Sequence, residues 1–168
     1  ISNFVYSHPM AGTENYGIKN SKKDLFKGST SIVCSMKNSS AESLEVIKNM
    51  WILVGCKIFK IEIDLHDEIL SAVSHVPHFI SFVLSKKIND SNFDDKYPWI
   101  RDRGSLADML RISKSDPVAW ANIFLSNKKY ISKFINEYID DLKLLDSNIN
   151  SDDVNNLISF LNKSNSNN

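Results

Sequence analysis

The stretch Leu65–Phe82, LHDEILSAVSHVPHFISF, decides the organisation of the chain. Its apolar residues recur at helical spacing, and Asp64 before it is a residue type that caps helix N-termini. We therefore expect a helix from Asp64 to about Ile88. Pro77 lies inside it, where a proline removes one backbone hydrogen bond and frees the carbonyl of Val73. The sequence predicts a long helix that is kinked or locally opened next to its proline.

Everything downstream of this stretch is also predicted to be helical, apart from a polar linker over residues 89–97. Ser115-Asp116-Pro117 combines a capping side chain with a proline suited to a first helical turn. The expected helices span Leu106–Ser113, residues 117–125, a long segment capped by Ser126 or Asn127, and Asp152 to about Leu161. On the long helix, a near-heptad seam that is long enough for a dimer interface is formed by Ile131, Phe134, Ile135, Tyr138, Leu142 and Leu145.

The residues before Asp64 have a pattern that favours strands. Asn3–Ser7 reads as a short strand that ends at His8-Pro9, because proline cannot donate to a β-ladder. A loop with a short helix near Asp24–Phe26 follows. The remaining expected elements are a strand over Thr30–Met36, a helix opened by the capping box Ser39-x-x-Glu42 and closed at Gly55, and a strand over Cys56–Ile63.

Composition narrows the classes of function. The 20 basic and 20 acidic side chains of the 168-residue chain cancel, which argues against nucleic acid or an anionic membrane as the main partner. No apolar run approaches the roughly 20 residues of a membrane span.

Cys34 and Cys56 form no CxxC motif, so a reducing cytoplasm is the expected compartment. The five glycines form neither GxGxxG nor a P-loop, and the start at Ile1 predicts that an upstream half is missing.

His8 is the first candidate for chemistry. A histidine at the end of a strand, followed by a glycine-containing loop, occupies the position where α/β sheets place site residues. The pKa of an imidazole, about 6.5, suits a general base at neutral pH. The alternative from local sequence is a histidine that merely ends a strand.

His75 and His78 flank the proline near one helical face, which leaves three interpretations open. They are hydrogen-bonded structural residues at a kink, zinc ligands together with His66 or Asp67, or the wall of a polar pocket that holds an anionic substrate.

Arg111 follows Asp108 by three residues, so the two share a helical face. They form either a surface ion pair of small energetic value or a site where the arginine grips a carboxylate. For Trp120, local sequence favours a core anchor over a ligand contact.

Three motifs together resemble the prephenate/arogenate dehydrogenase family. They are SHPMAGTENYGI at Ser7–Ile18, LHDEILSAVSHVPHFISF at Leu65–Phe82 and DMLRISKSDPVAWANIFLSN at Asp108–Asn127, in the family's order and spacing. The resemblance implies a mainly α fold. Residues 1–63 would be the last strands and helix of a truncated α/β, Rossmann-like dinucleotide-binding domain, and residues 64–168 a helical substrate-binding and dimerisation domain. One departure is Arg103-Gly104-Ser105-Leu106, which stands where the family often has a GPGF-like turn.

The resemblance also implies the chemistry, an NAD(P)-dependent oxidative decarboxylation of prephenate or arogenate in tyrosine biosynthesis. Hydride leaves the carbinol carbon for the nicotinamide, a base removes the hydroxyl proton, and loss of carbon dioxide aromatises the ring. His8 matches the catalytic histidine, and Arg111 matches the arginine that binds a substrate carboxylate. The other implied residues are Thr13, His66, His75, His78 and Trp120 around the substrate, with Glu14 and Asp108 as acidic residues that pair with Arg111 and regulate access.

The expected protein is therefore a cytoplasmic homodimer that uses NAD or NADP, with no metal, nucleic acid or membrane as a partner, and this chain alone is expected to be inactive. These residues do not decide between NAD and NADP or between prephenate and arogenate. Two alternatives stay open: a non-catalytic dimerisation or regulatory module with the same helices, and a related hydroxyacid dehydrogenase.

Overall fold

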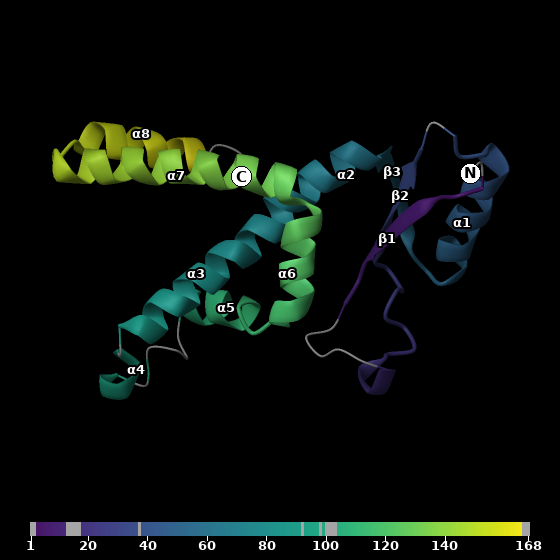
Figure 1. Ribbon diagram of the computed structural model, residues 1–168, viewed down its shortest axis with the longest axis horizontal. Coiled ribbons are helices and arrows are strands. Elements are labelled where there is room, and N and C mark those ends of the chain that lie inside the picture. Colours follow the sequence, from purple (N-terminus) through teal and green to yellow (C-terminus); the bar gives the residue numbers. More distant parts are fainter. Residues whose placement is uncertain are drawn as a thin grey trace.

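A computed structural model describes residues 3–12, 18–36, 38–91, 93–97, 99 and 104–165. The molecule is elongated (Figure 1). A small sheet with helix α1 lies at one end, and the helices α7 and α8 form a hairpin at the other. The fold is mainly α, as the sequence predicts.

The sheet has three strands in the order β1-β2-β3. They are β1 (Tyr6–Met10), β2 (Thr30–Ser35) and β3 (Lys57–Glu62). β1 runs antiparallel to β2, whereas β2 and β3 are parallel. The prediction that the first strand stops at His8-Pro9 is wrong, since β1 continues through Pro9, which lies opposite Ser31. Among the described strands β1 is an edge strand, where a proline can be accommodated because one side of the strand needs no ladder hydrogen bond.

The connection from β1 to β2 carries a 3-10 helix over Ile18–Asn20. The short helix predicted near Asp24–Phe26 is a series of turns instead.

The crossover from β2 to β3 is made by α1 (Ala41–Leu53). The hydroxyl of Ser40, one residue later than predicted, caps this helix by accepting the amide hydrogen of Ser43 at 3.1 Å. The expected reciprocal box between Ser39 and Glu42 is therefore wrong. Gly55 follows the helix with φ of 92°, in the left-handed region that closes helices, as predicted.

The two faces of the sheet are covered by different helices. α1 packs against β2 and β3. On the face that α2 covers, a small core joins Ile32 and Cys34 to Leu70 of α2, flanked by Ile61 and Ile63. This core fixes the position of α2 relative to the sheet, which determines the geometry of the site described below.

The predicted long helix is present and is interrupted where expected. It consists of α2 (Ile63–Leu70), a π turn (Ser71–His75) and α3 (Val76–Asp90), with Glu62 rather than Asp64 at its N-cap. Pro77 lacks the amide hydrogen that would continue an α-helical ladder, and the preceding turn widens so that the amide of Val76 donates to the carbonyl of Ser71.

Taken as one helix, Ile63–Asp90 spans 28 residues and is apolar and long enough to cross a membrane by length and composition alone. The expectation that no segment approaches that length was wrong on this measure. In the fold, α5 packs against α3, α7 packs against the π turn and α3, and 22% of the apolar window is buried within the described chain.

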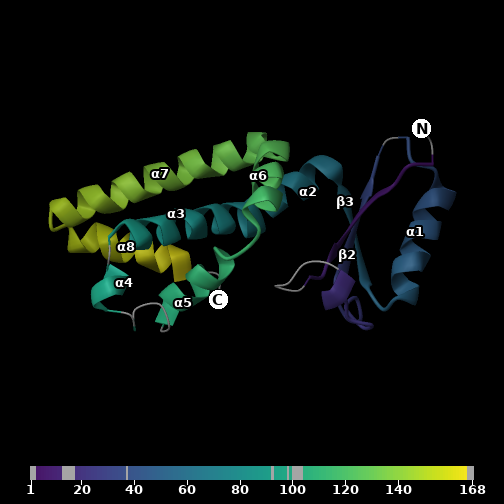
Figure 2. The same cartoon turned by 60° about the horizontal axis from the view of Figure 1, so that its bottom comes forward.

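The remaining helices are α4 (Phe93–Lys96), α5 (Gly104–Ile112), α6 (Pro117–Ser126), α7 (Lys128–Asn150) and α8 (Val154–Asn165). α4 lies within the predicted linker, so that segment is partly helical. The carboxylate of Asp116 accepts the amide hydrogens of Val118 and Ala119, which confirms the predicted start of α6. α7 and α8 lie side by side (Figures 1 and 2).

Candidate functional site

His8 and His66 meet where the edge strand passes α2. His8 lies opposite Ile32 in the register of β1 and β2, so its side chain is on the face of the sheet that α2 covers. Its Nδ1 is 3.0 Å from Nε2 of His66, and the two ring centroids are 5.3 Å apart. The fold therefore brings together two of the predicted site residues that are 58 positions apart in sequence.

Asp67 determines which nitrogens of this pair carry hydrogen. Nδ1 of His66 lies 2.8 Å from a carboxylate oxygen of Asp67, and a carboxylate only accepts, so this nitrogen donates. Nε2 of a neutral His66 must then accept, and the hydrogen shared by the two histidines belongs to Nδ1 of His8. The arrangement leaves Nε2 of a neutral His8 with a lone pair, as a proton acceptor requires.

The local electrostatics keep His8 in that neutral form. Partial burial lowers the pKa of His8, and the neighbouring His66 lowers it further because two imidazolium charges at this distance repel. This lowered pKa favours the neutral form of His8, the form that a base requires.

His75, the last residue of the π turn, and His78, in the first turn of α3, both contact the ring of Trp120. The His78 ring stacks on the indole, with centroids 3.6 Å apart and planes at 17°, whereas the His75 ring meets it edge-on at 6.1 Å. Nδ1 of His78 donates to the carbonyl of Ser74 at 2.9 Å, a carbonyl inside the π turn. Burial lowers the pKa of His78, against the opposing effect of this hydrogen bond.

Asn127 is a residue of this site that the sequence reasoning did not identify. It precedes α7 as predicted, but its side chain makes no cap and is buried against α2 and the π turn. Its Nδ2 lies 2.8 Å from the carbonyl of Asp67, 2.9 Å from the hydroxyl of Ser71 and 3.2 Å from Nδ1 of His75. No local sequence signal separates an asparagine that caps a helix from one that turns inward.

Arg111 and Asp108 are exposed on α5, which packs against α3. The hydroxyl of Ser81, fully buried on α3, donates to the carbonyl of Met109 and so fixes the turn of α5 next to Arg111. The grouping of Arg111 with the histidines around a substrate stays a prediction. Thr13 and Glu14, also predicted site residues, lie outside the described residues.

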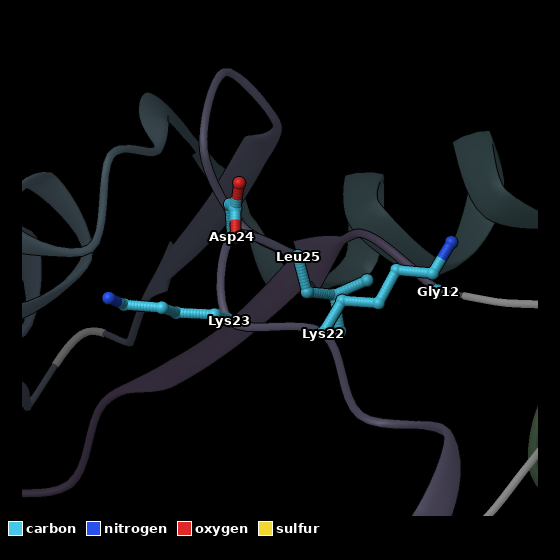
Figure 3. A pocket seen from close by; sticks show the side chains of 5 residues that line it. All are labelled: Gly12, Lys22, Lys23, Asp24 and Leu25. Carbon is cyan, nitrogen blue, oxygen red and sulfur yellow. The ribbon is translucent and has the colours of Figure 1, made fainter.

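Two hollows in the part of the surface that the structure describes have no histidine in their lining. One of about 580 Å³ is lined by Gly12, Lys22, Lys23, Asp24 and Leu25. The side chains of Lys22 and Lys23 point away from each other there, so they do not converge on one anion (Figure 3). An apolar hollow of about 220 Å³ borders Trp120 on α6, between Phe79 and Phe124. Within the described residues, no group of three or more His, Cys, Asp or Glu side chains is placed to hold a metal ion.

Comparison with known protein families gives matches to two consecutive parts of the chain. Residues 62–163 match "Prephenate dehydrogenase, dimerization domain", and residues 1–60 match "Prephenate dehydrogenase, nucleotide-binding domain".

Individual relatives agree with this match. A cyclohexadienyl dehydrogenase from Zymomonas mobilis is 31% identical over 150 residues, covering 89% of this chain and 51% of that protein. A prephenate dehydrogenase from Bacillus subtilis is 27% identical, covering 94% of this chain and 42% of that protein. The crystal structure of Aquifex aeolicus prephenate dehydrogenase in complex with hydroxyphenyl propionate and NAD+ superimposes with a TM-score of 0.86 at 32% identity, covering 98% of this chain and 57% of that one. The chain therefore spans about half the length of the curated relatives it matches.

Proposed function

Because this chain belongs to the prephenate dehydrogenase family, we propose that it forms the substrate-binding and dimerising part of an NAD(P)-dependent prephenate or arogenate dehydrogenase. The reaction would be the oxidative decarboxylation that ends in hydroxyphenylpyruvate or tyrosine. The observation that carries the proposal is the hydrogen-bonded chain Asp67–His66–His8, which leaves a basic nitrogen on His8.

His8 acts in this proposal as the general base. As the carbinol carbon of the substrate is oxidised, its hydroxyl proton passes to Nε2 of His8, which Asp67 and His66 hold in the required tautomer. Loss of the ring carboxylate as carbon dioxide then makes the ring aromatic. A bound nicotinamide would supply the hydride acceptor, and the 168 residues contain no GxGxxG motif to hold its phosphates.

Substrate binding is assigned to the remaining site residues. Arg111 would hold a substrate carboxylate bidentately, a task suited to a planar guanidinium. The ring of His78 stacks on the indole of Trp120, and the substrate ring would lie beside this aromatic pair. The supporting assignments are Thr13, His66 and His75 around the substrate and Glu14 and Asp108 as acidic residues that regulate access to Arg111.

The same proposal includes a cytoplasmic homodimer formed through the α7–α8 hairpin. Ile131 at the start of the predicted seam is buried within the chain, whereas Tyr138 is 43% and Leu142 62% exposed. Apolar side chains exposed in a row on a long helix are suited to burial against a second copy.

Titration of prephenate into the purified 168-residue chain tests the substrate assignment. We expect saturable binding that Arg111→Ala weakens about tenfold or more, because a hydrogen bond between charged groups contributes about 1.5–3 kcal/mol. Lys114→Ala is the matched control, since it removes an exposed cation three residues away. Absence of binding to the wild-type chain, or an equal loss in both variants, would contradict the proposal.

A further inference from the structure

We propose that Asn127 is a positioning residue that fixes His75 as the neutral tautomer with its hydrogen on Nε2, so that the pocket receives a neutral hydrogen-bond donor at this position. The functional meaning of this inference rests on the proposed substrate pocket. The tautomer itself follows from the contacts of one buried amide.

The orientation of that amide is determined by a backbone carbonyl. The carbonyl of Asp67 lies 2.8 Å from the Asn127 amide and can only accept, so the atom facing it must be the NH2 group. The hydroxyl of Ser71, 2.9 Å from the same nitrogen, is a second acceptor, and it shares the remaining amide hydrogen with Nδ1 of His75. An amide turned the other way would place its oxygen against the Asp67 carbonyl, at the cost of repulsion and a lost hydrogen bond.

With the amide oriented in this way, the NH2 group also faces Nδ1 of His75 at 3.2 Å. A hydrogen on that ring nitrogen would point at another donor, so Nδ1 must carry a lone pair. A neutral His75 then carries its hydrogen on Nε2, and a doubly protonated His75 is disfavoured because it would set two donors against each other.

The surroundings of His75 act in the same direction. Burial has the largest effect on the pKa of His75 and lowers it. The Asp67 carboxylate opposes this effect, while His66, His78 and His8 add to the lowering. In the proposed substrate pocket, this histidine therefore orients a bound group without contributing positive charge, and charge recognition is left to the arginine.

Nitrogen NMR of the ¹⁵N-labelled 168-residue chain tests the inference, since the protein has only four histidines and His75→Gln identifies the signal. We expect Nδ1 of His75 to show the shift of an unprotonated nitrogen at neutral pH. Asn127→Asp replaces the NH2 group with an acceptor, so it should move the hydrogen to Nδ1 and raise the pKa of His75. Asn136→Asp, the same change at an exposed position on α7, should alter neither property.

A wild-type His75 with hydrogen on Nδ1 would overturn the inference, and this result does not depend on whether Asn127→Asp folds. An Asn127→Asp protein with a native spectrum but an unchanged His75 tautomer would overturn it as well. Prephenate added to the same samples distinguishes the two proposals: a wild-type chain with the expected tautomer that does not bind prephenate contradicts the proposed function and leaves the tautomer assignment supported.

Discussion

Replacing Trp120 with leucine removes the aromatic ring that both His75 and His78 contact. The indole makes three ring contacts, with His78 at 3.6 Å, Phe124 at 5.6 Å and His75 at 6.1 Å between centroids. Leucine keeps part of the apolar area on α6 but supplies no aromatic face. The substitution therefore tests whether Trp120 orders the site, as proposed, or serves only as core.

The expected loss follows from these contacts. An aromatic pair contributes about 0.5–1.5 kcal/mol beyond its buried area, and truncation of a buried Trp to Ala costs about 3–5 kcal/mol. Trp120 is half-buried and leucine replaces some of its volume, so we expect the free energy of unfolding to fall by about 2–3 kcal/mol. For a chain of this size that corresponds to a melting temperature lower by about 5–10 °C.

Urea unfolding and prephenate titration, both at a temperature where the variant is folded, measure the two consequences. We expect prephenate to bind at least about fivefold more weakly, since roughly 1 kcal/mol of orientation is lost. Trp99→Leu is the control, because that side chain is 63% exposed and its loss should change stability by less than about 0.5 kcal/mol. A Trp120→Leu protein with unchanged stability would refute the packing argument, and one with reduced stability but unchanged prephenate affinity would refute the binding role.

Two further predictions concern pH and assembly. The pKa values of His8, His75 and His78 are lowered in the folded chain, so below about pH 6.5 the unfolded chain binds more protons than the folded chain. The free energy of unfolding should therefore be constant above that pH and decrease below it. A urea midpoint that is independent of pH from 7.5 to 5.5 would contradict this prediction. Leu142→Glu should dissociate the proposed dimer in sedimentation experiments at micromolar concentration. The control is Leu125→Glu, at a position 70% exposed on α6, which should leave the dimer intact. Equal behaviour of the two variants would exclude the α7 seam as the interface.

Much of the helical architecture could be predicted because its signals are local. Pro77 cannot donate to a helical ladder, so an interruption was predictable at the position where the π turn occurs. Asp116 caps α6 through the contacts that its sequence position implies. The error at Pro9 arose because the effect of a proline depends on whether its strand lies at the edge of the sheet, and neighbouring strands are not visible in a local pattern.

For the candidate site, the sequence indicated the histidines but not the contacts between them. The motifs indicated His8, His66, His75 and His78, yet the contact between His8 and His66 depends on how α2 packs on the sheet. Asn127 was expected only as a helix cap, since its inward orientation becomes visible only when α7 is placed beside the π turn.

Enzyme kinetics show whether His8 is the base of a dehydrogenase. The enzyme for this measurement joins the nucleotide-binding segment of the Zymomonas mobilis relative to residue 1 of this chain, and NADH formation is followed with prephenate as substrate. We predict prephenate-dependent turnover whose kcat falls about 10²–10⁴-fold in His8→Asn, with prephenate binding retained. A folded, prephenate-binding His8→Asn enzyme with unchanged kcat would exclude His8 as the base, and a folded wild-type enzyme that binds prephenate and NAD+ without turnover would contradict the proposed function.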